Sequence, residues 1–108
     1  MSRQKGDVAE SLAVRHLMER GCRILARNFY FKGGEIDIVA EKGGVIHFVE
    51  VKSGRGFEPV YNLTPEKLRR VVNGARTWLK RHDLDMPWQI DALIVRGDTC
   101  EWIENVTI

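Results

Sequence analysis

Two apolar runs joined by a glycine pair constrain the fold of this chain more than any other feature. Residues 35–41 and 45–52 flank Gly43-Gly44, and a short turn centred there pairs residues whose numbers sum to 87. Val39 then faces Phe48, whereas a slip of one residue would move isoleucines onto the polar face. The turn and the hydrophobic pattern therefore predict the same antiparallel hairpin. Its second face collects Ile36, Ile38 and Ala40 opposite Val51, Val49 and His47.

Two amphipathic helices are expected outside this hairpin. The first runs from Asp7 to Arg20, where Asp7 and Glu10 have the spacing of a capping box and Gly21 provides a stop. The second begins after Thr64 as N-cap and ends near residues 81–83.

Three further strands are expected, at residues 22–31, 88–95 and 99–103, with residues 53–63 as a flexible loop. The resulting order, α-β-β-β-α-β-β, predicts an α/β fold with a mixed sheet flanked by helices. At 108 residues, we expect one domain that spans residues 1–108.

Composition is that of a soluble globular protein, with 44% hydrophobic and 30% charged residues. No apolar run approaches the roughly 18–20 residues of a membrane span, and no signal-type segment follows the N-terminus. Cys22 and Cys100 have no metal-binding spacing and are expected as free thiols. We therefore expect a cytoplasmic protein with no membrane partner.

Two carboxylates meet across the predicted hairpin, because its register sets Asp37 opposite Glu50. Their Cβ atoms would lie roughly 4.5–5.5 Å apart, which calls for a shared proton or a bound cation. Mg²⁺ prefers such oxygen ligands, and Lys52 stands on the same strand face. The alternative is structural: Glu35 pairs with Lys52 while Asp37 and Glu50 are solvated.

Glu10 is a further candidate, because its position near the apolar stripe of the first helix would direct it toward the sheet. The alternative is the capping box with Asp7.

The second helix has a basic face opposite its apolar stripe. Its cations, with Arg55 in the preceding loop, could contact phosphates or could form a solvated face. These cations are Lys67, Arg69, Arg70, Arg76, Lys80 and Arg81, against the single acid Glu66. Residues 1–82 carry 16 of the 17 basic side chains, so this part of the chain could attract a polyanion; the alternative is that the charges are scattered over a solvated surface.

The remaining polar candidates carry weaker signals. His16, His47 and His82 lack metal-ligand spacing and are expected in structural roles. Asp91 lies in an otherwise apolar strand, where it would either hydrogen-bond across the sheet or approach the carboxylates.

Several of these segments together resemble a known family. They are residues 6–21 with Glu10, Arg27-Asn28, Gly34-Glu35-Ile36-Asp37, Phe48-Val49-Glu50-Val51-Lys52, Thr64-Pro65-Glu66-Lys67 and Ile90-Asp91. The chain is similar to the YraN-like family of the PD-(D/E)xK nuclease superfamily, which is related to archaeal Holliday-junction resolvases.

That resemblance implies a restriction-endonuclease-like α-β-β-β-α-β core with an extra C-terminal strand. It implies that Glu10, Asp37 and Glu50 bind Mg²⁺ or Mn²⁺ and that Lys52 assists the attacking water. Lys67 matches a basic position that contacts phosphate. Gln89 departs from the family, which often has Arg there.

The function implied is metal-dependent hydrolysis of phosphodiester bonds in DNA, with branched or junction DNA as one candidate substrate. A homodimer is expected if the substrate is a junction, because symmetric cutting needs two-fold symmetry. Nucleic-acid contacts are expected from Arg55, Lys67, Arg69, Arg70 and Arg76. The alternative is a non-catalytic nucleic-acid-binding module or partner scaffold with the same fold.

Overall fold

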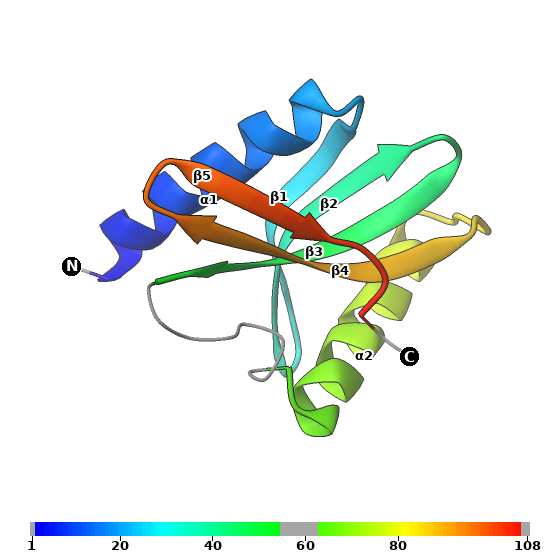
Figure 1. Cartoon of the computed structure of the whole chain (residues 1–108). Coiled ribbons are helices and arrows are strands. Elements are labelled where there is room, and N and C mark those ends of the chain that lie inside the picture. The colour runs from blue at the N-terminus through cyan, green and yellow to red at the C-terminus, as the bar shows by residue number, and fades with distance from the viewer. Residues whose placement is uncertain (1, 55–62, 107–108) are drawn as a thin grey trace.

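The computed structural model describes residues 2–54 and 63–106, with side chains placed from residue 7 onward. The elements follow the predicted order (Figure 1). They are α1 (Ser2–Glu19), β1 (Arg23–Phe31), β2 (Gly34–Lys42), β3 (Val45–Ser53), α2 (Pro65–Arg81), β4 (Trp88–Arg96) and β5 (Thr99–Ile103). No helix in this part of the chain is long and apolar enough to cross a membrane.

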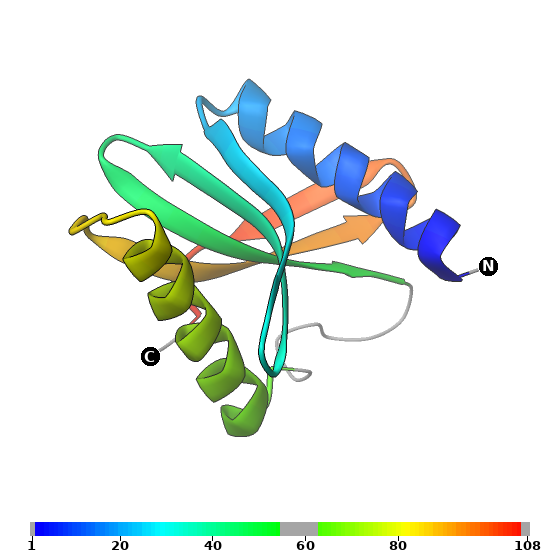
Figure 2. The same ribbon diagram turned by 180° about the vertical axis from the view of Figure 1, so that it is seen from behind.

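The five strands form one mixed sheet in the order β1-β2-β3-β4-β5. The β3–β4 pair is parallel, and the other neighbouring pairs are antiparallel. The helices lie on opposite sides of the sheet (Figures 1 and 2), and α1 contacts all five strands. The predicted mixed sheet flanked by helices is therefore confirmed, including the additional C-terminal strand β5.

Each helix buries its apolar stripe against one face of the sheet. On the α1 side, Ala9, Ala13 and Leu17 pack with a cluster that includes Ile38 and Val49. These small alanines allow the helix to approach the strands closely. The α2 side is built around Phe48, whose ring makes edge contacts with Trp78 and Trp88 at centroid distances of 5.9 and 5.8 Å. Aromatic pairs of this geometry add to the stabilisation from buried area.

The first helix begins earlier than the sequence predicts. It starts at Ser2, which places Asp7 inside the helix, so the predicted capping box of Asp7 with Glu10 is wrong. Its end agrees with the prediction, because Gly21 has a φ of 91° and its N–H donates to the Met18 carbonyl. Only glycine adopts this backbone conformation without a steric penalty.

The β2–β3 hairpin has the predicted register over its turn-proximal half. The pairs run from Lys42–Val45 to Ile38–Val49, and both turn glycines have positive φ, as a tight two-residue hairpin turn requires. The ladder then stops, so Asp37 and Glu50 do not form a ladder pair, although their side chains meet as predicted. Glu35 and Lys52, which were predicted to lie opposite each other, do not form a ladder pair either.

An inserted side chain explains this break in the ladder. The Val51 N–H donates to Oδ2 of Asp37 at 2.8 Å, so a carboxylate takes the place of a backbone acceptor. Beyond this point the strand turns, and Ile36 joins the α2 cluster instead of the α1 cluster that holds Ile38. The predicted common face for Ile36, Ile38 and Ala40 is therefore wrong for Ile36.

A close contact fixes the β1–β2 hairpin against α2. Figures 1 and 2 show the tip of this hairpin beside the N-terminal half of the helix. Gly74, near the middle of α2, is buried, and a Cβ at this position would lie 2.4 Å from Cε1 of Phe31. The helix therefore requires glycine at this position to accommodate the aromatic ring.

Gly74→Ala is expected to lower the free energy of unfolding by about 1–3 kcal/mol, because the added methyl overlaps a packed ring. At an exposed helical site the same change would stabilise the protein by roughly 1 kcal/mol. Urea denaturation measures the difference. Asn73→Ala, at the exposed neighbouring position, serves as the control and should change stability by less than about 0.5 kcal/mol. Equal stability of Gly74→Ala and the native protein would contradict the packing argument.

Candidate functional site

The break in the β2–β3 ladder brings two carboxyl groups together. Asp37 and Glu50 occupy the positions immediately after the last ladder pair, and a side-chain hydrogen bond joins them. Both side chains are half-buried, and Oε1 of Glu50 is buried without a hydrogen-bond partner. The alternative that these carboxylates are merely solvated is therefore wrong. The described residues also include no ion pair between Glu35 and Lys52.

Burial and mutual repulsion shift the protonation of this pair. Desolvation, followed by the charge of Asp37, raises the pKa of Glu50 to about 9. Desolvation also raises the pKa of Asp37, although hydrogen bonds from Val51 and Glu50 and the charge of Lys52 oppose it. The pair therefore retains a proton at neutral pH in the absence of another positive charge.

Glu10 reaches toward the same region from α1. Its side chain is only 13% exposed, and its nearest cation is the Arg27 guanidinium, 4.0 Å from Oε1. Desolvation and the charges of Asp37 and Glu35 raise the pKa of Glu10. The Glu10 carboxylate therefore lies within electrostatic reach of Asp37, and its Oε1 is buried without a hydrogen-bond partner.

A pocket opens beside this carboxylate group. Glu35, Glu50 and Lys52 line it from the sheet, and Lys67 and Arg70 line it from α2. Anionic and cationic side chains thus face one cavity, where a phosphate and a cation could be bound together.

Glu35 was not among the predicted site residues and was considered only as an ion-pair partner of Lys52 in the structural alternative. In the structure its charge raises the pKa of both Glu10 and Glu50. Glu35 stands two residues before Asp37 on the same strand, and this spacing was the available signal.

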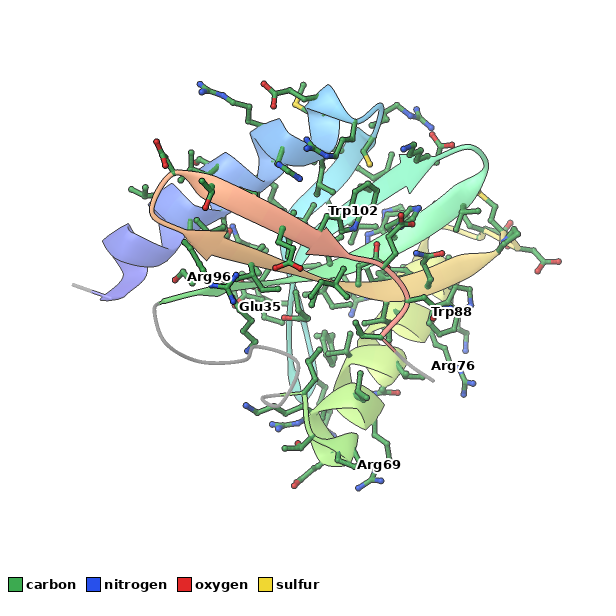
Figure 3. All side chains as sticks on the ribbon, viewed as in Figure 1. Glu35, Arg69, Arg76, Trp88, Arg96 and Trp102 are labelled. Carbon is green, nitrogen blue, oxygen red and sulfur yellow. The ribbon has the colours of Figure 1, made fainter. Side chains whose placement is uncertain are left out.

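The basic residues predicted to bind nucleic acid fall into two groups. Lys67 and Arg70 line the pocket, whereas Arg69 and Arg76 line a separate shallow groove with Leu68, Val72 and Asn73. Figure 3 shows Arg69 and Arg76 extending from α2 away from the sheet. Arg55 lies outside the described residues.

The chemistry of these side chains fits a divalent cation. Among the described residues, the buried side-chain polar atoms without a hydrogen-bond partner are Oε1 of Glu10 and Oε1 of Glu50. An unpaired buried carboxylate oxygen is costly, and a cation would satisfy it. The three carboxylates of Glu10, Asp37 and Glu50 are not gathered closely enough for ligand atoms within 4.8 Å of one another. Binding at all three would require Glu10 to approach the pair.

A second polar cluster does meet that spacing, and it comprises His47, Asp91 and Glu104. The carboxylate at its centre, Asp91, already has hydrogen-bond partners on both oxygens. Oδ1 of Asp91 accepts hydrogen bonds from Gln89 and the Asn105 N–H, each at 2.9 Å.

The other oxygen of Asp91, Oδ2, lies 2.7 Å from Nδ1 of His47 and accepts a 2.9 Å hydrogen bond from Trp102. Burial raises the pKa of Asp91, but these hydrogen bonds outweigh it and hold the pKa below its ordinary value. Asp91 therefore fastens three strands together and has no lone pair free for a metal. Of its two predicted roles, the structure favours hydrogen bonding across the sheet.

Stability should depend on pH through Glu50. Because its folded pKa of about 9 exceeds the ordinary 4.5, the folded state holds a proton that the unfolded state releases. The stabilisation is full at low pH and is lost as pH rises toward 9. Glu50→Gln keeps the shape without the charge, so it should exceed the native protein in stability at pH 8 by about 2 kcal/mol.

Thermal and urea unfolding from pH 5 to 9 without added metal measure this difference. Glu19→Gln, which neutralises an exposed carboxyl on α1, is the control and should follow the native pH profile. Parallel profiles for Glu50→Gln and the native protein would contradict a protonated, buried Glu50.

Comparison with known proteins identifies the family. The sequence model described as "Uncharacterised protein family UPF0102" matches residues 9–95, which include α1 from Ala9 and all of β1 to α2. A UPF0102 protein of Wolinella succinogenes is 53% identical over 108 residues, covering the whole of both chains. Another from Helicobacter hepaticus is 47% identical over 107 residues, covering 99% of this chain and 97% of the relative. The chain therefore belongs to the UPF0102 family.

Proposed function

We propose that this protein is a metal-dependent endonuclease of the PD-(D/E)xK type that hydrolyses phosphodiester bonds in DNA. The observation that carries the proposal is that one buried carboxylate oxygen on each of Glu10 and Glu50, beside Asp37, has no hydrogen-bond partner. A cation-binding role explains why two predicted metal ligands leave costly unsatisfied atoms in the same region. The adjoining pocket adds the cationic side chains that a phosphate needs.

Asp37, Glu50 and Glu10 would hold Mg²⁺ or Mn²⁺ through their carboxylate oxygens. The bound cation would supply positive charge that activates a water molecule and offsets the charge developing on the phosphate. The other roles in the reaction would be performed by side chains of the protein. Lys52 lines the pocket, and its charge lowers the pKa of both Asp37 and Glu50. Its ammonium would orient the attacking water and donate hydrogen bonds to a phosphate oxygen.

The substrate would be held through its backbone. Lys67 and Arg70 line the pocket with Glu50, so they would bind the phosphate nearest the reaction. Such contacts give affinity without reading sequence. This arrangement suits a structure-selective nuclease, and branched or junction DNA is the substrate class we propose to test first. Symmetric cutting of a junction would require a homodimer.

Cleavage assays on labelled four-way-junction, flapped and linear duplex DNA test the proposal directly. The native protein should cut with Mg²⁺ or Mn²⁺ and not with EDTA. Glu50→Gln should abolish cutting, and Lys52→Met should slow it by about 10²-fold or more, because it removes the group that assists the water. Glu19→Gln should cut at the native rate. Failure of the native protein to cut any substrate with either metal would contradict the proposal.

A second candidate, a non-catalytic nucleic-acid-binding module, is favoured by one observation. Arg69 and Arg76 form a cationic groove that is separate from the carboxylate pocket. A binding module needs only such a surface. Its affinity would fall with salt and would not depend on metal or on Asp37.

Salt titrations separate the two candidates. The double variant Arg69→Ser/Arg76→Ser should bind duplex DNA more weakly and reduce the slope of log K against log salt by about 1.8, or roughly 0.9 per phosphate contact. Arg96→Ser, an exposed arginine at the end of β4, should leave the slope unchanged. If the double variant kept the native slope of log K against log salt, this groove would not be a DNA-binding surface. Native binding without any cleavage would favour the binding module over the nuclease.

A further inference from the structure

Asn28 occupies a conspicuous position in β1. It falls between the ladder pairs Arg27–Ile38 and Phe29–Ile36, so it lies across from Asp37 in the sheet. Asp37 in turn is the neighbour of Glu50 beyond the β2–β3 ladder. Asn28 therefore extends the row of polar residues that crosses β2 and β3 at the candidate site.

The backbone of Asn28 is left-handed, with a φ of 54°. Among the described residues, two other non-glycine residues share a positive φ: Asp83 follows α2, and Asn105 follows β5. Asn28 is the one of the three that lies inside a strand. A residue held in this region carries a conformational cost, and such residues gather where the geometry of a site requires them.

The side chain of Asn28 indicates what the left-handed backbone achieves. The Asn28 amide lies near enough to the Glu10 carboxylate, which reaches the sheet from α1, to lower the pKa of that carboxyl. The preceding residue supports the same contact, because the Arg27 guanidinium lies 3.5 Å from Oγ of Ser11 and 4.0 Å from Oε1 of Glu10. Two consecutive β1 residues thus contact the same turn of α1.

A neutral amide suits this task better than a cation. It compensates part of the burial of Glu10 without neutralising the carboxylate, and it leaves Oε1 without a hydrogen-bond partner. The Arg27 guanidinium stays 4.0 Å from Oε1, whereas a cation in direct contact would form a tighter ion pair and compete with a metal ion.

We propose that Asn28 is a positioning residue that holds the Glu10 carboxylate toward Asp37 and Glu50 so that the three can bind one divalent cation. This inference rests on the proposed function, because it assigns Asn28 a role in the same metal-binding group. Hydrogen bonds that orient ligating carboxylates commonly change metal affinity by roughly 10–100-fold.

Asn28→Gly separates this role from a purely structural one. Glycine adopts the left-handed backbone without a penalty, so a residue needed only for its backbone would be replaced at no loss. We expect Asn28→Gly to keep or raise thermal stability but to weaken Mn²⁺ binding by about tenfold or more. Binding is measured by isothermal titration calorimetry or by the electron paramagnetic resonance signal of free Mn²⁺. DNA cleavage should fall in parallel.

The chain provides a matched control. Asp83→Gly makes the same kind of change at a left-handed residue beyond α2 and should leave Mn²⁺ affinity unchanged. Glu10→Gln tests whether Asn28 acts through Glu10. If it does, the double variant Glu10→Gln/Asn28→Gly should bind Mn²⁺ less than twofold more weakly than Glu10→Gln alone.

The outcomes distinguish the two proposals. Native Mn²⁺ binding that Asn28→Gly leaves unchanged overturns the positioning role and keeps the proposed function. A full additional tenfold loss in the Glu10→Gln background also overturns the route through Glu10. No Mn²⁺ binding by the native protein overturns the metal-dependent function, and the positioning role falls with it.

Discussion

The candidate site depends on one hydrogen bond, from the Val51 N–H to the Asp37 carboxylate. This bond replaces a rung of the β2–β3 ladder, and the interruption gives Asp37 and Glu50 room to meet side by side. Normal strand pairing would have satisfied the backbone at this point and left the two carboxylates directly opposite. The sheet therefore exchanges a regular backbone contact for two adjacent carboxyl groups that retain a proton at neutral pH.

Much of the fold was predictable because it follows from short-range signals. The Gly43-Gly44 turn and the alternation of apolar residues determined both the hairpin and its register. Gly21 marked the end of α1 correctly, whereas Asp7 was misread as a cap because a helix can continue through a residue that would also suit its start. Ladder breaks and strand twist at Ile36 escaped prediction, since periodicity assumes that each strand stays regular.

The sequence predicted which residues form the site better than it predicted how they are arranged. The segment around Glu50 indicated which residues carry the charge, but proximity depends on packing between distant elements. The contact of Phe31 with Gly74 places the hairpin tip beside α2, and this places Glu35 and Lys67 at the same pocket. No local pattern encodes that contact. Asp91 shows the converse, because a polar residue in an apolar strand suggested a site and instead fastens β3, β4 and β5.

The position of α1 across all five strands has a consequence for how the protein assembles. The strands β1 to β3 can pair with local contacts, whereas parallel β4 must wait for the crossover through α2, and β5 follows. Because α1 precedes all five strands in the sequence, it finds its complete docking surface only after β5 has been synthesised. Since α1 carries Glu10, the constellation of carboxylates is completed late in folding. In a nascent chain the acidic groups would therefore not be brought together until the sheet had formed and α1 had packed on it.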